Sequence, residues 1–457
     1  MSRDGVMQGV GEMCRILNTG GARIHFIGVL GVSMSSLAEV LSRRGFHVSG
    51  SDAALCGTAP PLGVDVTTPP EVAIRCADAV VRSLAISDGH PEVICARGAG
   101  VPVFSRPELL GALMLSYKRR IGVSGTHGKS TTVAMLSEIY RAAGRCPTVL
   151  SGARLPTGKA HILGSSDDFI YEACEYRDAF LHFSPSCAII TNVELDHTDY
   201  FPDVDALRLS FTKSVEGAER VVLPFGDSEL RRALSGAGVD ILTYGEDADA
   251  DYRSIPTSVG AYGCRFQLTF RGASLGEISL AMRGRHNILN ATAAIAAAHS
   301  EGIDISDMRR ALSGFSGIER RLEYLGKLGG THVYYDYAHH PTAIRAALEA
   351  LRDIYGGVAV LFRPHTYTRT RDLWRGFVSS LSLADEVGIY EIYAAREARI
   401  DGVTAKRLAG DIVGAVALSS RDTVDFIRSS RSTAAVLMGA GDLSGERDEI
   451  VRMIKEK

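Results

Sequence analysis

The chain has 457 residues, of which 46% are hydrophobic and 23% charged, with a formal net charge of −3. This composition is typical of a globular protein of about two to four domains. The charge excludes a strong attraction to nucleic acid or to acidic membranes. The 8 cysteines form no C-x-x-C pair, which argues against a disulfide framework and favours a reducing compartment. Neither a signal peptide nor a run of about 18 apolar residues is visible, so we expect a cytoplasmic enzyme without stable membrane association.

The first segment alternates short strands with helices. The run "RIHFIG" predicts a strand, a helix follows from about Ser33 to Arg44, Gly45 ends it, and "FHVSGSD" is the next strand. This is a β-α-β unit, which needs a parallel pair of strands. Its turn resembles the dinucleotide pattern G-x-G-x-x-G, but Leu30 and Ser33 replace the second and third glycines. A nicotinamide cofactor is therefore not expected.

Two further α/β segments follow along the chain. The second has a strand, a glycine turn and a long helix at "RRIGVSGTHGKSTTVAMLSEIYRAAG", then a β-rich stretch from about Asp251 to Met282 and an Ala-rich helix. The third begins near Glu319 and contains four apolar strands that each precede polar or glycine-rich residues. We predict an α/β protein of three domains, with a Rossmann-like domain at 1–118, a central P-loop domain at 119–318 and a second Rossmann-like domain at 319–457.

Almost every unusual polar cluster comes directly after an apolar strand. In open parallel sheets, ligands bind outside the carboxyl ends of the strands. Polar clusters at the carboxyl ends of several strands predict binding sites more strongly than any single motif does.

The run "GTHGKSTT" matches the end of a P-loop, although Val123 stands where the full pattern has its first glycine. Backbone N–H groups and the helix N-terminus are expected to hold the phosphates of ATP. Lys129 is expected to reach the β- and γ-phosphates, and Ser130 to bind Mg²⁺. The predicted nucleotide-binding residues here are Gly125, Thr126, His127, Gly128, Lys129, Ser130 and Thr131.

Magnesium needs oxygen ligands near the phosphates, and one or two carboxylates suffice. Glu172, after the strand "FIY", is one candidate, and the run "NVELDH" offers Glu194, Asp196 and His197. By itself a histidine in such a loop is more often a capping residue than a magnesium ligand.

The motifs "GTHGKSTT", "YEACEYRDAF", "TNVELDHTDYF", "GRHNILNA", "GIERRLEY", "YDYAHHPTAI", "RPHTYTRTRDL" and "GAGD" occur in this order. In this the chain resembles the Mur ligases from about Arg23 to Asp442, and most resembles the type that joins L-alanine to UDP-N-acetylmuramate. The resemblance implies the three-domain Mur ligase architecture and a role in peptidoglycan precursor synthesis. It also implies ATP and Mg²⁺ as cofactors, an acyl-phosphate intermediate, and a monomer or homodimer.

The resemblance also implies roles for individual residues. Ser130, Glu172 and His197 match magnesium ligands, and the catalytic set comprises Lys129, His197, His340, His365 and Arg369. Asn287 and Asn290 share one helix face and match adenine-recognising amides, with helix capping as the alternative. Arg320 and Arg321 match paired arginines of which at least one reaches phosphate, and Asp336 and Tyr337 match nucleotide contacts. The UDP-sugar is expected at Gly28, Gly31, Ser33, Met34, Ser35, Asp52 and Ser83.

The chain departs from the family at several positions. Cys174 stands where Asp is frequent, Arg363 where Gln is frequent, and Thr366 where some members have Arg. Lys213 lies where some relatives carry a carbamylated lysine, a role we do not assign. Leu30 replaces a glycine that would allow close approach to diphosphate, yet binding is expected to survive through the helix N-terminus near Ser33. Alternatives are a related ligase with another amino acid, a murein peptide or a folate-type substrate, and a non-catalytic descendant.

Overall fold

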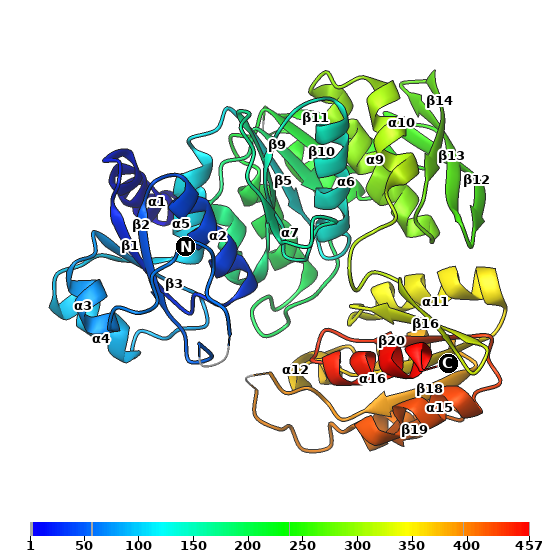
Figure 1. Cartoon of the computed structure of the whole chain (residues 1–457). Coiled ribbons are helices and arrows are strands. Elements are labelled where there is room, and N and C mark those ends of the chain that lie inside the picture. The colour runs from blue at the N-terminus through cyan, green and yellow to red at the C-terminus, as the bar shows by residue number, and fades with distance from the viewer. Residues whose placement is uncertain (1–2, 56–57, 237, 396, 457) are drawn as a thin grey trace. The chain divides into compact units, whose positions relative to one another are not determined.

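The computed structural model describes residues 3–55, 58–236, 238–395 and 397–456, so Cys56 lies outside the described residues. The chain forms two compact units (Figure 1). The first unit comprises Met1–Gly125, Thr132–Thr191 and Arg208–Leu242, and the second comprises Thr126–Thr131, Asn192–Leu207 and Thr243–Lys457. Within the described residues, no helix combines the length and apolar character that a membrane crossing requires.

The N-terminal part of the first unit is a parallel four-stranded sheet. Its strand order is β2 (His47–Ser51), β1 (Arg23–Ile27), β3 (Ala79–Arg82) and β4 (Val103–Ser105). Its helices are α2 (Val32–Arg43), α3 (Pro70–Arg75), α4 (Pro91–Gly98) and α5 (Arg106–Met114). The predicted β-α-β unit is confirmed. The sequence analysis did not predict α1 (Arg3–Asn18), whose Val6, Val10 and Met13 are buried at helical spacing.

Six strands of a ten-stranded sheet, which continues through β11 to β14 (residues 240–280), lie in the first unit and include the phosphate-loop strand. Their order is β10 (Arg220–Pro224), β9 (Cys187–Ile190), β5 (Arg119–Ser124), β8 (Asp168–Glu172), β6 (Thr148–Leu150) and β7 (His161–Ile162). Only the β6–β7 pair is antiparallel. The helices that follow β5, β9 and β10 are α6 (Lys129–Ala142), α7 (Val204–Ser214) and α8 (Ser228–Leu234), and the 3₁₀ segment η1 (Tyr176–His182) follows β8.

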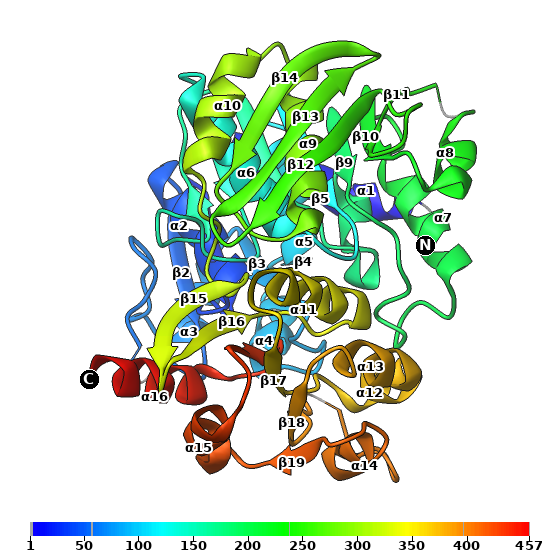
Figure 2. The same ribbon diagram turned by 90° about the vertical axis from the view of Figure 1, so that its right-hand side faces the viewer.

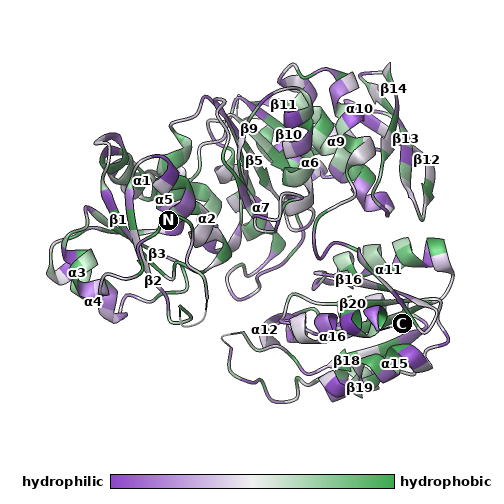
Figure 3. Cartoon of the chain, in the orientation of Figure 1, coloured by the Kyte–Doolittle hydropathy of each residue, from purple (hydrophilic) through white to green (hydrophobic). Residues whose placement is uncertain are grey.

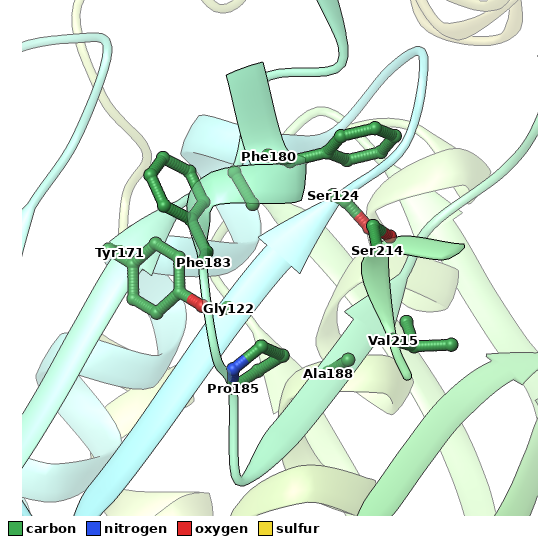
Figure 4. A pocket seen from close by; sticks show the side chains of 10 residues that line it. Gly122, Ser124, Tyr171, Phe180, Phe183, Pro185, Ala188, Ser214 and Val215 are labelled. Carbon is green, nitrogen blue, oxygen red and sulfur yellow. The ribbon is translucent and has the colours of Figure 1, made fainter. Parts of the chain in front are cut away.

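The core beside β5 is nearly filled. A cavity of about 10 Å³ lies among Gly122, Tyr171, Phe180 and Phe183, room for about one water molecule (Figure 4). A Cβ atom at Gly122 would lie 2.6 Å from the Tyr171 hydroxyl oxygen. Glycine in the middle of β5 therefore makes room for the Tyr171 ring, and packing fixes the strand that leads into the phosphate loop.

The second unit contains the β-rich stretch. Strand β11 (Asp240–Gly245), whose last residues belong to this unit, pairs in parallel with β12 (Tyr252–Gly260). Antiparallel pairs join β12 to β13 (Gly263–Phe270) and β13 to β14 (Ala273–Leu280), which confirms the predicted β-rich character. The Ala-rich helix is α9 (Arg285–Ser300), which is buried along most of its length, and α10 (Ile305–Gly314) follows it.

The last sheet has the order β15 (Glu323–Leu328), β16 (Thr331–Asp336), β20 (Ala434–Met438), β17 (Val358–Phe362), β18 (Glu386–Tyr390) and β19 (Val416–Leu418). The β15–β16 pair is antiparallel and the other pairs are parallel. The surrounding helices are α11 (Pro341–Tyr355), α12 (Tyr367–Asp372), α13 (Trp374–Leu381), α14 (Ala405–Gly410), α15 (Thr423–Ser429) and α16 (Ser444–Lys455), and the short 3₁₀ segment η2 (Ser420–Asp422) precedes α15.

Both faces of this sheet are covered. Helices α11 and α13 lie on one side of the sheet and α15 and α16 on the other (Figure 2). Val360 and Phe362 of β17 face the core formed with α11 and α13, whereas Leu361 faces the core formed with α15 and α16. Such two-sided burial explains why "VAVLF" is a continuous apolar run rather than an alternating one. Helix α11 carries both hydrophobic and hydrophilic residues, with Ile344 and Leu348 buried (Figure 3).

Candidate active site

The phosphate loop has the strand–turn–helix context that the sequence analysis predicted, between β5 and α6. Gly128 has a φ of +85°, and a Cβ atom there would lie 2.4 Å from Oδ1 of Asn290. Both the backbone conformation and the close neighbour therefore require glycine. The tight turn leads directly into the N-terminus of α6, and a helix N-terminus after such a turn is the arrangement that binds phosphate.

The residues after β9 hold the loop in place. The Thr126 N–H donates to the Asn192 carbonyl at 3.0 Å, and the Thr126 hydroxyl bonds to the backbone of Glu194 at 2.9 Å. The Asn192 amide accepts from the His127 N–H at 2.9 Å and donates to the His127 carbonyl at 3.0 Å. Asn192 thus fixes His127 on both sides, a role that the sequence analysis did not assign.

Lys129 is the first residue of α6, and its ammonium group donates to the Thr126 carbonyl at 3.3 Å. The side chain therefore folds back over the turn that it follows. Ser130 and Thr131 are buried in the first helical turn. This placement brings the charge of Lys129 to the mouth of the loop, where it can meet the phosphates of a nucleotide.

Asn287 and Asn290 lie on one face of α9, as their spacing predicts. Asn290 donates to Asn287 Oδ1 at 3.1 Å, and Asn287 donates to the Arg283 carbonyl at 2.7 Å. Both side chains are buried. Since Asn290 borders Gly128, this pair of amides lies next to the phosphate loop.

A buried ion pair joins two of the predicted motifs. Arg369 of α12 donates to Asp196 Oδ1 at 2.8 Å and contacts His365 Nδ1 at 3.1 Å. The Asp196 and Arg369 side chains are only 7% and 9% exposed. His197 follows with a φ of +53°, and its N–H donates to the same oxygen of Asp196 at 2.7 Å. His197 and Arg369 thus both bind Asp196, which the sequence analysis had offered only as a magnesium ligand, and His365 contacts Arg369.

Burial also sets the charge of the histidines here. It lowers the pKa of His340 to about 4, with His127 as the next contribution, and the pKa of His365 to about 4, with Arg369 next. Burial alone would raise the pKa of Asp196, but Arg369 holds it well below its usual value. Both histidines are therefore neutral near pH 7, while Asp196 is ionised.

Asp336 and Tyr337 end and follow β16. The Asp336 carboxylate accepts the N–H of Leu322 at 2.6 Å and that of Ala338 at 2.7 Å. Its oxygens therefore shape the turn around it. The Arg320 and Arg321 guanidinium groups lie 4.5 and 5.2 Å from the centroid of the Tyr337 ring. Tyr337 thus orients both arginines through cation–π contacts.

The predicted UDP-sugar turn lies between β1 and α2. Gly28 has a φ of +81°, whereas Leu30 is not among the residues with positive φ. The Leu30 N–H donates to Asp52 Oδ2 at 3.0 Å, and the other Asp52 oxygen accepts from the Ala54 N–H. A cavity of about 510 Å³ opens beside this turn, lined by Gly28, Asp52, Ile86 and other residues. The Ser83 hydroxyl lies 3.8 Å from the place of a Cβ atom at Gly28.

The remaining residues of this turn lie at the start of α2. Gly31 is the N-cap, Met34 is buried, and Ser33 and Ser35 are half-buried. Arg106, which the sequence analysis did not single out, donates to the Ser33 hydroxyl at 3.3 Å. Burial lowers the pKa of Arg106, while Cys174 and Glu172 act in the opposite direction. A half-buried cation thus lies beside the UDP-sugar turn, close enough to Glu172 at the end of β8 for the two charges to interact.

Glu172 is the last residue of β8, and its carboxylate accepts the Gly152 N–H at 2.9 Å. Two of the family departures have a structural explanation. Arg363 forms an ion pair with the buried Glu446 and lies over the Tyr390 ring, so it holds the start of α16. Thr366 has a φ of +67° and is the N-cap of α12, which starts the helix that carries Arg369.

Three family descriptions match successive parts of the chain. They are "Mur ligase family, catalytic domain" at residues 23–118, "Mur ligase middle domain" at 123–298 and "Mur ligase, glutamate ligase domain" at 320–443. A UDP-N-acetylmuramate–L-alanine ligase of Agathobacter rectalis is 38% identical over 398 residues, 84% of this chain and 86% of that protein. The chain belongs to the Mur ligase family.

Solved structures of Mur ligases have the same fold. The UDP-N-acetylmuramate–alanine ligase MurC of Thermotoga maritima superposes with a TM-score of 0.77 at 26% identity, over 95% of this chain and 99% of that one. A murein peptide ligase of Psychrobacter arcticus superposes with a TM-score of 0.70, also at 26% identity, over 96% of this chain and 99% of that one. The predicted Mur ligase architecture, with α/β domains and a P-loop, is therefore confirmed.

Proposed function

We propose that this Mur ligase is an ATP-dependent carboxylate–amine ligase that joins L-alanine to the lactyl carboxylate of UDP-N-acetylmuramate. The proposal rests on the phosphate loop, which Asn192 holds through two hydrogen bonds to the His127 backbone. It also rests on 38% identity to a UDP-N-acetylmuramate–L-alanine ligase. The activity belongs to peptidoglycan precursor synthesis, which takes place in the cytoplasm. We assign UDP-sugar binding to a domain at 1–118, ATP binding to a domain at 119–318, and contacts with the nucleotide and the amino acid to a domain at 319–457.

The residues present fit ATP and Mg²⁺. Gly128 allows the Asn290 amide to approach the loop closely, and the N-terminus of α6 follows it. The Ser130 hydroxyl and the Glu172 carboxylate are oxygen ligands of the type that Mg²⁺ prefers. His197 is the proposed ligand of a second magnesium. When bound, the metal withdraws charge from the phosphate oxygens.

The chain's own residues prepare an anionic carboxylate for attack by an amine. Lys129 offsets the negative charge that accumulates where the carboxylate meets the terminal phosphate of ATP. The acyl phosphate that results has the leaving group that a carboxylate lacks. Arg369 donates to His365 Nδ1, so the proton of this neutral ring lies on Nε2, from which it can be donated to a substrate oxygen.

The UDP-sugar is proposed to bind at the cavity beside Gly28, with Gly31, Ser33, Met34, Ser35 and Ser83 around the turn. Asp52 keeps the turn closed through its bond to the Leu30 N–H. The N-terminus of α2 and the cation of Arg106 favour a diphosphate there. Asn287 and Asn290, next to the phosphate loop, are proposed to contact the adenine.

A murein peptide ligase is the second candidate. The structure from Psychrobacter arcticus favours it, because its fold and identity to this chain are close to those of the MurC structure. The two activities differ in the amine that attacks, a single amino acid or a peptide.

Release of phosphate and ADP should require both UDP-N-acetylmuramate and L-alanine. A coupled phosphate assay compares L-alanine, L-serine, glycine and the peptide L-alanyl-γ-D-glutamyl-meso-diaminopimelate at equal concentrations. A single methyl group discriminates by about 1–3 kcal/mol, so glycine should be about 10–200-fold less efficient than alanine. Turnover with the peptide alone would instead establish the second candidate, and no turnover with any acceptor would refute both.

Leu30→Gly should leave the affinity for UDP-N-acetylmuramate unchanged within roughly threefold, which is less than 1 kcal/mol. The reason is that Leu30 acts through its backbone N–H, and its φ does not require glycine. Gly28→Ala is the contrasting variant, because a Cβ atom at a φ of +81° is strained. Isothermal titration measures both. If Leu30→Gly bound UDP-N-acetylmuramate tenfold more tightly than the wild type, the leucine side chain would obstruct the diphosphate.

A further inference from the structure

Among the described residues, one group of three side chains has the atoms and spacing of a metal site: His127, Glu194 and His340. His127 lies in the phosphate loop, Glu194 in the loop after β9, and His340 at the start of α11. His127 Nε2 is 3.1 Å from His340 Nδ1 and 3.5 Å from Glu194 Oε2, and the latter two atoms are 3.7 Å apart.

These separations match a four-coordinate ion. Bonds of about 2.0–2.2 Å in a tetrahedron place the ligand atoms about 3.3–3.6 Å from one another, and the observed values lie within a few tenths of an ångström. Octahedral bonds of about 2.0–2.1 Å, which Mg²⁺ demands, bring neighbouring ligands to about 3 Å. Two imidazoles and one carboxylate are ligands of zinc sites and not of typical magnesium sites.

Two of the three ligands are also held by partners outside the group. His340 Nε2 lies 3.3 Å from the Leu195 carbonyl, to which it must donate, so Nδ1 keeps the lone pair that a metal needs. The Thr342 N–H donates to the same Nδ1 atom at 3.4 Å, which again shows that Nδ1 is unprotonated, and a bound metal would replace this long helix N-cap bond. The Thr342 hydroxyl donates to Glu194 Oε2. Such outer partners fix the orientation of metal-ligating histidines and carboxylates.

The group is accessible and can exist without a metal. The side chains of His127 and Glu194 are 19% and 35% exposed, so an ion can enter and a water can complete its coordination. Without an ion, the His127 Nε2–H can donate to His340 Nδ1, and binding moves that proton to His127 Nδ1. We infer that His127, Glu194 and His340 form a binding site for a four-coordinate divalent ion such as Zn²⁺, separate from the proposed magnesium ligands.

Cobalt(II) tests the site, because its visible absorption reports coordination number. Titration of the full chain with Co²⁺, in the absence of nucleotide, should show one saturable site with the intense bands of four-coordinate cobalt and no thiolate charge-transfer band. Zn²⁺ should displace the cobalt. Glu194→Gln, which keeps the shape of the side chain, should weaken binding by at least about 100-fold, and Thr342→Val by about 10-fold.

His47→Ala is the matched control, because this exposed histidine lies outside the group and its loss should not change the titration. Circular dichroism checks that each variant is folded. The inference is overturned by six-coordinate cobalt, by a thiolate band, or by equal affinities of the wild type and Glu194→Gln. Since neither ATP nor a UDP-sugar is present, this outcome does not depend on the result of the ligase assay.

Discussion

Lys129→Ala is expected to lower the rate of ADP release by at least about 10²–10³-fold, the loss seen when one charge-stabilising donor is removed from an active site. The Lys129 ammonium group lies over the turn, 3.3 Å from the Thr126 carbonyl. Its positive charge is the protein's own means of bringing the anionic carboxylate to the anionic phosphate. Steady-state turnover with UDP-N-acetylmuramate, L-alanine and ATP measures the effect.

Lys118→Ala provides the control for this experiment. Lys118 is 82% exposed and forms only a surface ion pair with Asp167, so its removal should leave turnover unchanged. Both variants should unfold at the temperature of the wild type, because neither lysine is in the hydrophobic core. Activity retained in Lys129→Ala would reject the phosphate-loop assignment.

Arg369→Ala is expected to destabilise the protein by about 3–5 kcal/mol, because it leaves Asp196 buried without its ion-pair partner. The two side chains are 9% and 7% exposed, so water cannot replace the guanidinium group. Urea denaturation followed by tryptophan fluorescence and circular dichroism measures the loss. The double variant Arg369→Met/Asp196→Asn should recover much of it, since no unpaired charge then remains.

The difference in unfolding free energy between the wild type and Arg369→Ala should also depend on pH. Arg369 holds the pKa of Asp196 well below its unfolded value, so this carboxylate contributes stability that is present above about pH 4. The contribution is lost as the pH falls through the folded pKa. The gap between the wild type and Arg369→Ala should therefore be largest near neutrality and should shrink in strong acid.

Arg371→Ala is the matched control on the same helix. Arg371 pairs with Asp372 at the surface, with 54% of its side chain exposed, and its loss should hardly change stability at any pH. If Arg369→Ala were no less stable than Arg371→Ala, the Asp196–Arg369 pair would not contribute to the stability of the fold.

The elements with the clearest patterns were predicted correctly. The β-α-β unit at Arg23–Ser51, the turn before α6 and the Ala-rich α9 are local features in which periodicity, glycine positions and helix propensity agree. Helix α1 was missed because its three glycines, Gly5, Gly9 and Gly11, lower its helix propensity. Its helical structure depends on tertiary packing, which a local sequence pattern does not reveal.

The candidate site was predicted in part. Individual site residues could be identified because they follow strands, but the sequence did not reveal which residues they contact. Asp196 pairs with Arg369, 173 residues away in the sequence, and His127 contacts His340 across 213 residues. No local pattern encodes contacts between residues so far apart in the sequence, because these contacts depend on how the sheets are assembled. Arg106 was missed for the same reason, since its hydrogen bond to Ser33 forms only when the start of α5 lies beside the start of α2.

The sequence by itself determined the family, the phosphate loop and the residues that follow each strand, because strand–turn–helix chemistry is local and the order of the motifs is specific. Only the tertiary structure decided which of these side chains meet and which are charged. It showed that the Leu30 N–H donates to Asp52, and that Asp336 accepts one backbone N–H from its own turn and one from Leu322. Burial and partner distance set these roles, and both arise only when distant segments pack together.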